Sequence, residues 1–224
     1  MTTSTPSPSS SSAPSAIAGI TIPDSALARD ATALVREIES DLLYHHSLRV
    51  FVFGSLQGQR RGLAYDPELL YVGAMFHDIG LVEGHRSPAD RFEVDGANAA
   101  RDFLEERGVP ADAIRVVWDA IALHTTPGIP QHKEPEVALV TAGVELDVLG
   151  IGYHDLTNTQ REQVLSALPR VNFKHEIIEA FGAGLAHKPQ TAFGNVKADV
   201  LERTLPGYRR PNFCDAILTS PFTQ

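Results

Sequence analysis

Apolar residues recur every three or four positions along most of the chain, which is the pattern of amphipathic helices. No alternating pattern bounded by hairpin turns accompanies it, although residues 50–53 alone would also fit a strand. We therefore predict an all-α fold. The helices are expected over residues 24–43, 45–57, 66–80, 93–107, 111–124, 135–149, 158–168, 172–187 and 192–204, followed by an irregular Pro-rich end.

The N-terminal stretch differs from the rest in composition. Residues 1–16 are almost entirely Ser, Thr, Pro and Ala, and such a segment buries too little apolar surface to offset the entropy of ordering. We predict a disordered tail over residues 1–22, of which the end, "AIAGITIP", can rest on the domain. Residues 23–224 are predicted to form a single helical bundle.

Composition and charge narrow the class of protein. The chain has 224 residues and a single cysteine, Cys214, so neither an intramolecular disulfide nor a thiolate-rich zinc site is expected. The net charge of -9 and the lack of a basic run argue against nucleic acid and anionic membranes as partners. No apolar run reaches the about 18 residues of a membrane span. We expect a cytoplasmic protein with a small-molecule substrate, and a homo-oligomer is compatible with this.

The segment "AMFHDIGL", residues 74–81, places His77 and Asp78 inside an apolar run. Burying a polar group without a partner costs about 2–7 kcal/mol, so a partner is expected. The two residues come at a predicted helix end, where neighbouring side chains are able to converge on one ion.

Other ionisable side chains also lie on apolar helix stripes. These are His46, Glu93, His124 and Asp147. A lone buried histidine is more often a hydrogen-bonded core residue, and a lone buried aspartate often caps a helix. One bound cation accounts for the whole set, and imidazole with carboxylate suits zinc, iron or manganese.

The order of these motifs resembles the HD-domain superfamily of metal-dependent proteins. Its ligand signature, H…HD…D, falls on His46, His77, Asp78 and Asp147. Within that superfamily, the segments "HHSLRVFVFG", "AMFHDIGL", "RFEVDGANAARDFL", "VVWDAIALHTT" and "LVTAGVELDVLG" resemble the cyanamide hydratase family. The resemblance covers about residues 40–190. It implies an all-helical fold, one divalent metal, usually zinc, and addition of water to a small nitrile, with cyanamide becoming urea.

This resemblance leads to a hypothesis for each site residue. Asp78 would be both ligand and proton shuttle, His124 would orient the substrate or donate to it, and Glu93 would lie beside them in the pocket wall. The expected apolar wall consists of Phe76, Phe92 and Trp118. Iron(II) and manganese(II) are alternatives to zinc.

Two other enzyme classes stay open. A phosphohydrolase, the commonest activity in the superfamily, needs cationic groups for phosphate. The sequence offers Arg49, Arg86, Arg91 and Lys133 for this. A diiron oxygenase would use Glu93 and His124 as ligands of a second metal.

Overall fold

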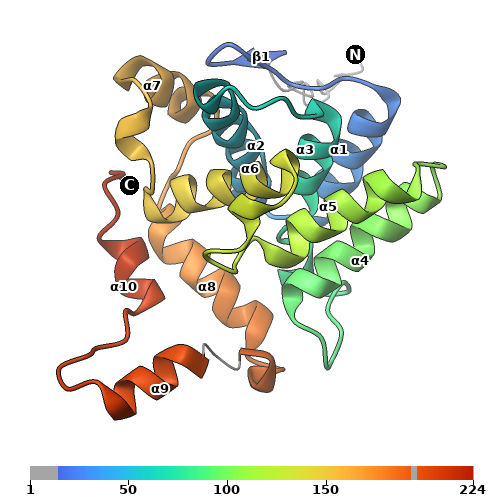
Figure 1. Ribbon diagram of the computed structural model, residues 1–224. Coiled ribbons are helices and arrows are strands. Elements are labelled where there is room, and N and C mark those ends of the chain that lie inside the picture. The colour runs from blue at the N-terminus through green and yellow to red at the C-terminus, as the bar shows by residue number, and fades with distance from the viewer. Residues whose placement is uncertain (1–14, 193–195, 224) are drawn as a thin grey trace, which may run out of the picture.

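The computed structural model describes residues 15–192 and 196–223, and these form ten α-helices with almost no strand (Figure 1). The prediction of an all-α fold is confirmed. The helices are α1 Ala26–Ile38, α2 Asp41–Arg61, α3 Pro67–Phe76, α4 Phe92–Glu105, α5 Ala111–Leu123, α6 Pro135–Val144, α7 Asn158–Ala167, α8 Phe173–Leu185, α9 Val196–Thr204 and α10 Phe213–Leu218. Short turns of helix are η1 Ile79–Leu81, η2 Pro130–His132, η3 Glu145–Leu149, η4 Tyr153–Asp155 and η5 Pro189–Ala192.

Side-chain caps explain where the first helices begin. Ser40 accepts a hydrogen bond from the backbone N–H of Leu43, and Asp66 accepts from those of Glu68 and Leu69. The cap at Ser40 starts α2 at residue 41 and separates it from α1, whereas the sequence pattern predicted that the first helix continues to residue 43. Helix α2 therefore has 21 residues and is the longest described helix.

Helix α2 is the central element of the fold and is buried along most of its length. It packs against α3 and α6. Helices α4 and α5 pack against each other as a second pair (Figure 1). A Cβ on Gly54 would approach the carbonyl oxygen of Leu139 to 2.6 Å, and one on Gly143 would approach that of Val50 to 2.2 Å. The backbones of α2 and α6 come this close only because both positions are glycine.

The ends of the described chain cover the bundle. Strands β1 Ala16–Ile17 and β2 Ile20–Thr21 form a two-residue antiparallel pair, and Ile17 and Ile20 are buried against the core. Residues 16–21 thus rest on the domain, as suggested for "AIAGITIP", whereas residues 1–14 of the predicted tail lie outside the described residues.

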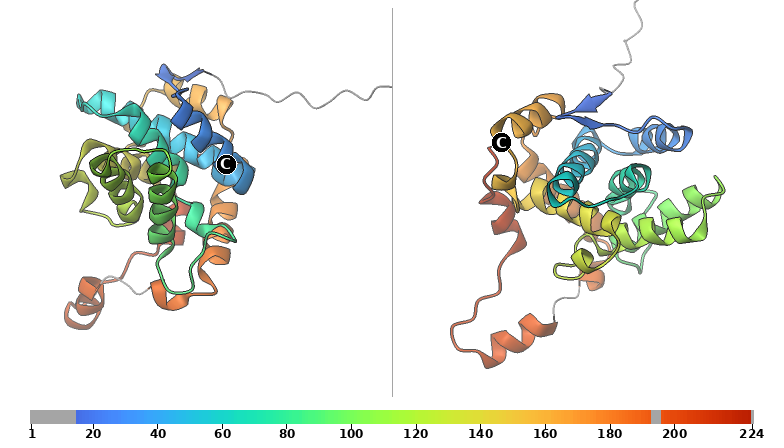
Figure 2. Two further views of the ribbon diagram at one scale, coloured as in Figure 1. Left: turned by 90° about the vertical axis from the view of Figure 1, so that its right-hand side faces the viewer. Right: turned by 45° about the horizontal axis from the view of Figure 1, so that its top comes forward.

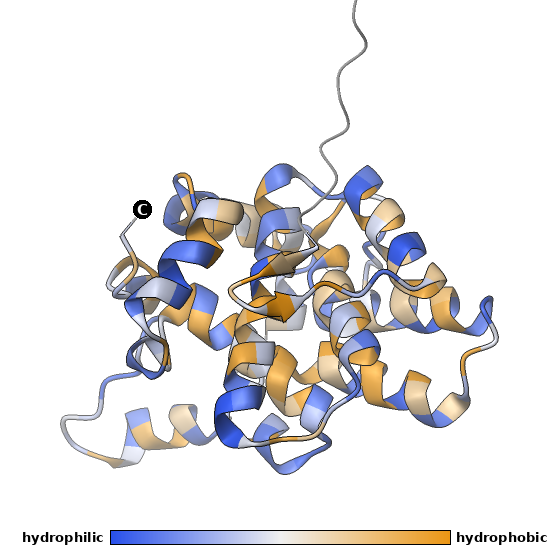
Figure 3. Ribbon diagram, turned by 90° about the horizontal axis from the view of Figure 1, so that it is seen from above, coloured by the Kyte–Doolittle hydropathy of each residue, from blue (hydrophilic) through white to orange (hydrophobic). Residues whose placement is uncertain are grey.

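The C-terminal segment departs from the bundle and returns to it. Helix α9 lies away from helices α1–α6, and α10 comes back to pack on α8 (Figure 2). Coloured by hydropathy, the helices show apolar and polar residues interspersed along the chain (Figure 3). Within the described ranges, no helix has both the length and the apolarity needed to cross a membrane.

Candidate metal centre

Two histidines and an aspartate meet in the interior, at the point where α3 ends beside α2. His46 comes from the first turns of α2, His77 is the C-cap of α3, and Asp78 follows directly. His77 Nε2 lies 3.2 Å from His46 Nε2 and 3.3 Å from Asp78 Oδ2. His46 Nε2 lies 3.7 Å from the same oxygen. The helix end thus brings two adjacent side chains to one point, as the sequence predicted.

The remaining ring nitrogens of these histidines are occupied by acceptors. Nδ1 of His77 lies 2.7 Å from the carbonyl oxygen of Ala74, and Nδ1 of His46 lies 2.6 Å from Asp147 Oδ2. His124, the C-cap of α5, repeats the arrangement with its Nδ1 2.6 Å from the carbonyl oxygen of Ile121. Carbonyl and ionised carboxylate oxygens only accept, so these Nδ1 atoms donate, and in the neutral form of each ring Nε2 carries the lone pair that faces the cluster.

Three polar atoms at the centre have no hydrogen-bond partner among the described residues. Both carboxylate oxygens of Asp78 and Nε2 of His124 are buried in this state. His124 Nε2 lies 3.7 Å from Asp78 Oδ1, which is too far for a hydrogen bond. Buried acceptors that converge without donors are what a cation-binding site provides, so His46, His77 and Asp78 fit a metal ion.

The electrostatics of the cluster keep the carboxylate charged. Burial alone would raise the pKa of Asp78, but the neighbouring His77, His46 and His124 bring it well below its usual range. Burial lowers the pKa of His46, and burial together with the charge of His77 lowers that of His124 to about 4. Burial opposes protonation of His77 as well, but Asp78 outweighs it and raises the pKa of that ring. His124 is therefore neutral near pH 7.

Asp147 lies in the π-helical turn η3, where it is held by three cationic or donor groups. Arg49 Nε lies 2.9 Å from Oδ1 and 3.0 Å from Oδ2, and Arg170 also binds Oδ1. Both guanidinium groups pack over the ring of Phe173, at 4.8 and 4.2 Å from its centroid. Burial would raise the pKa of Asp147, but Arg170, Arg49 and His46 together depress it far below the ordinary value.

Asp147 thereby orients the ring of His46 from the side opposite the cluster. It does not lie within the compact group of His46, His77 and Asp78, whose ligand atoms are all within 4.8 Å of one another. Its direct ligation of the metal stays a prediction.

Sequence reasoning missed Arg170, which follows α7 in a loop. The only available signal was its position between two predicted helices.

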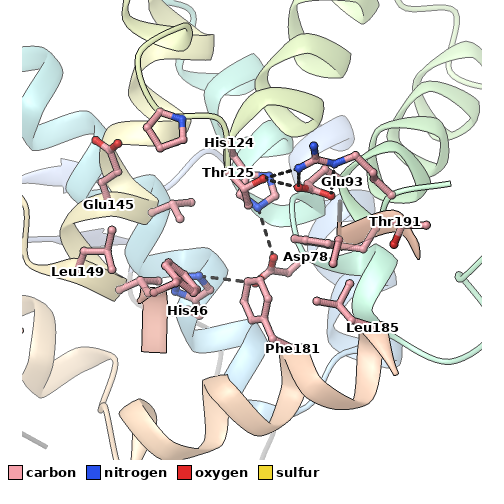
Figure 4. Close-up of a pocket in the computed structure, with 17 residues that line it drawn as sticks. His46, Asp78, Glu93, His124, Thr125, Glu145, Leu149, Phe181, Leu185 and Thr191 are labelled. Carbon is pink, nitrogen blue, oxygen red and sulfur yellow. Dashed lines mark hydrogen bonds and ion pairs between the residues drawn. The ribbon is translucent and has the colours of Figure 1, made fainter. Parts of the chain in front are cut away.

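A pocket of about 380 Å³ opens from the cluster toward the surface (Figure 4). His46, Asp78 and His124 line its inner end. The rest of its lining is mainly apolar and comes from α4, α6, η3, α8, η5 and α10. In the close-up, Phe181 and Leu185 project from α8 toward Asp78, with Leu149 facing them from η3.

Glu93 lies in the pocket wall beside His124, as expected from its helix stripe. Its carboxylate accepts hydrogen bonds from Arg91 and from the hydroxyl of Thr125. Burial would raise the pKa of Glu93, but these two donors and the nearby His124 lower it. Glu93 is thus ionised, and its carboxylate is already hydrogen-bonded to Arg91 and Thr125.

The structure corrects two of the three expected wall residues. Phe92 lines the pocket, but Phe76 is fully buried and packs on Phe103 with ring centroids 4.9 Å apart. Trp118 lines a separate recess between α4 and α5, where its Nε1 donates to Asn98. The aromatic character of these residues suggested an apolar wall, but it does not specify which of two spaces each side chain meets.

The four cationic side chains considered for phosphate binding each bind another group of the protein. Arg49 binds Asp147, Arg86 donates to the carbonyls of Leu81 and Ala183, and Arg91 binds Glu93. Lys133 lies 2.7 Å from Asp119. Only Arg91 of these four lines the pocket.

Comparison with known protein families indicates the class of protein. The family model of the HD domain matches residues 43–151, a segment that contains all four positions of the H…HD…D signature. The match and the buried cluster support the HD-domain superfamily, whose members are generally metal-dependent enzymes, among them hydrolases and phosphohydrolases. A search among curated proteins found no match. The chain is accordingly similar to metal-dependent HD-domain enzymes, and the reaction has to be argued from the pocket.

Proposed function

We propose that this protein is a metal-dependent hydratase that adds water to a nitrile, with cyanamide, which would become urea, as the simplest substrate. His46, His77 and Asp78 would hold one divalent ion, with Asp147 orienting His46 from behind, and zinc is the first choice before iron(II) or manganese(II). The observation that supports the proposal is a set of unpartnered acceptors, on Asp78 and His124, at the inner end of a largely apolar pocket.

A divalent ion in this position would supply Lewis acidity and lower the pKa of water toward neutrality. The chain's own residues would supply orientation. His46 and His77 keep fixed tautomers through Asp147 and the carbonyl of Ala74, so their Nε2 lone pairs are directed before any ligand arrives. Preorganisation of this kind avoids reorientation during the reaction.

His124 is suited to accept a proton rather than donate one. Its Nδ1 donates to the carbonyl oxygen of Ile121, and its low pKa leaves Nε2 unprotonated near pH 7. Hydration forms one bond between the water oxygen and the nitrile carbon and moves one water proton to the nitrile nitrogen, and the resulting imidic acid becomes the amide when its hydroxyl proton moves to the same nitrogen. We propose that His124 Nε2 orients the water by accepting its hydrogen bond, while Glu93 holds Thr125 and Arg91 in the wall.

The charge of the pocket favours a neutral substrate over a phosphate ester. Arg91 is the only arginine or lysine that lines it among the described residues, and the carboxylate of Glu93 already neutralises it. Phosphoester hydrolysis is the alternative that the HD domain itself supports, and it would have to rely on the metal for phosphate binding. A diiron site is less favoured, because Glu93 is bound by Arg91 and Thr125, and the described part of the chain contains one metal-competent group.

The decisive experiment measures urea formation from cyanamide by the purified protein loaded with zinc, iron(II) or manganese(II). The Asp78→Ala variant is the control, because it removes a group of the centre and leaves the pocket walls in place. Turnover that depends on Asp78 would support the hydratase. Release of phosphate from p-nitrophenyl phosphate, with no urea from cyanamide, would replace it by the phosphohydrolase.

A further inference from the structure

The pocket is far larger than cyanamide, and its excess volume is apolar. About 380 Å³ corresponds to roughly a dozen water molecules at ~30 Å³ each, whereas cyanamide has only three non-hydrogen atoms. A substrate of that size would leave most of the space to water against apolar walls. Pockets of this volume ordinarily enclose molecules of drug-like size.

One wall of the pocket is a row of aromatic rings that leads from the cluster to the surface. The ring of Phe92 lies 5.5 Å from that of His124, and Phe181 lies 5.3 Å from Phe92. Phe213 continues the row, 5.9 Å from Phe181, and is 48% exposed at the outer end. The row therefore joins the candidate reaction site to solvent along a continuous apolar face.

The facing wall is mainly aliphatic, although Glu145 of η3 also lines it. Val144, at the end of α6, and Val148 and Leu149, in η3, line the same pocket. Leu149 and Phe181 project into the space from opposite sides (Figure 4). Between an aromatic and an aliphatic wall, a flat or branched hydrocarbon body gains more from burial than a polar one would.

We infer that the site prefers neutral nitriles with an apolar body, aryl or branched alkyl, to cyanamide, which the pocket would accept as a poorer substrate. The nitrile group would lie against His46, Asp78 and His124, and the body would lie along Phe92, Phe181 and Phe213. This inference rests on the proposed hydration reaction for its chemistry, but its claim concerns the shape and polarity of the substrate.

A series of alkyl nitriles of similar intrinsic reactivity tests the claim. Acetonitrile, propionitrile, butyronitrile and 3-phenylpropionitrile would be compared by kcat/KM in the metal-loaded enzyme. Each added methylene is expected to raise kcat/KM about fourfold until the pocket is filled. A flat series, with 3-phenylpropionitrile no better than acetonitrile, would overturn the inference and leave the hydratase intact.

Two variants of α10 distinguish the loss of a substrate contact in the pocket wall from a loss of stability. Phe213→Ala is expected to lower kcat/KM for 3-phenylpropionitrile about tenfold, because it removes the outer ring of the row. Leu218→Ala is the matched control, since Leu218 belongs to the same helix, is similarly exposed and does not line the pocket. Equal losses in both variants would mean that α10 acts through stability alone and would count against the inference.

A binding measurement distinguishes failure of the inference from failure of the proposed reaction. Isothermal titration with 3-phenylpropionamide, the hydration product, needs no turnover. If no nitrile reacts but the amide binds, and binds about tenfold more weakly to Phe213→Ala, the reaction is wrong and the apolar-body inference stands. If nitriles react but the amide does not bind, the inference fails.

Discussion

Nδ1 of His46 lies 2.6 Å from Oδ2 of Asp147, a residue 101 positions further along the chain. The contact fixes which nitrogen of His46 carries the proton and leaves Nε2 directed at Asp78. Because Arg49 and Arg170 hold the same carboxylate, the orientation of a candidate ligand depends on charges that lie outside the cluster.

The first prediction concerns the cluster itself. His77→Ala and Asp78→Ala should each reduce bound metal from about one ion per chain to a small fraction, because each removes one of three converging groups. Elemental analysis of the purified variants measures this. His175→Ala, on the exposed surface of α8, is the control and should keep the wild-type metal content. Full metal content in both cluster variants would refute the assignment.

The second prediction concerns Arg170. Arg170→Met should weaken metal affinity about tenfold, in the range typical of groups that orient ligands, because Asp147 loses one of its two guanidinium partners. If Arg170 acts through Asp147, adding Arg170→Met to Asp147→Asn should weaken binding no further.

Arg161→Met provides the comparison for a merely structural arginine. Arg161 is buried, donates to the carbonyls of Tyr153 and Leu156, and lies over the ring of Tyr153. Its loss should lower stability without changing metal affinity in the folded protein. A competition titration with a chromogenic chelator gives both affinities, and identical effects of the two substitutions would contradict the role given to Arg170.

The third prediction concerns the close contact of α2 and α6. Gly143→Ala would place a Cβ 2.2 Å from the carbonyl oxygen of Val50, so the helices must separate. The expected loss of stability is about 1–3 kcal/mol, together with weaker metal binding, because His46 and Asp147 lie on the two displaced segments. Chemical denaturation and the chelator titration measure the two effects. Gly182→Ala in α8, where a Cβ meets open space, should leave metal binding unchanged and raise stability by about 0.5–1 kcal/mol, because alanine is the better helix former.

The fourth prediction concerns a buried ion pair that joins α4 to the segment after α8. Lys188 Nζ is fully buried and binds Asp95 Oδ2, which also accepts from the backbone N–H of Ser87. Lys188→Met alone should destabilise the fold by about 3–5 kcal/mol, because it leaves an unpaired buried carboxylate. The double variant Asp95→Leu/Lys188→Met should recover most of that loss. If the stability loss of the double variant equals the sum of the losses of Asp95→Leu and Lys188→Met, the two residues are not coupled.

Helical periodicity was sufficient to predict the fold class and the inward direction of His46, His77, Asp78 and His124. The same periodicity puts Asp95 on one helix face with Asn98 and Asp102, where a solvent-exposed side chain is expected, but Asp95 is buried. The apolar residues of α4 reflect its packing against α5. Asp95 is buried by a different partner, Lys188, which lies 93 residues further along the chain. A local pattern carries no information about such a distant partner.

The pocket shows the same limit. Phe213 lies in a stretch rich in proline, which gave no helical period and was expected to be irregular, yet its ring forms the outer part of the wall. Arg170 likewise sits in a loop, and its importance follows only from the return of the chain to Asp147. Long-range contacts of loop residues depend on the complete tertiary arrangement.

The segment matched by the HD domain ends at residue 151, while Phe181, Leu185, Thr191 and Phe213 of the pocket all lie after it. The groups proposed to perform the chemistry and many of those that meet the substrate's body are therefore encoded in successive stretches of the gene. Substitutions in the later stretch can retune which molecules are accepted while the catalytic apparatus stays constant. The same separation offers an engineering route, in which only the positions of α8 to α10 that line the pocket are varied and the metal-binding scaffold is left unchanged.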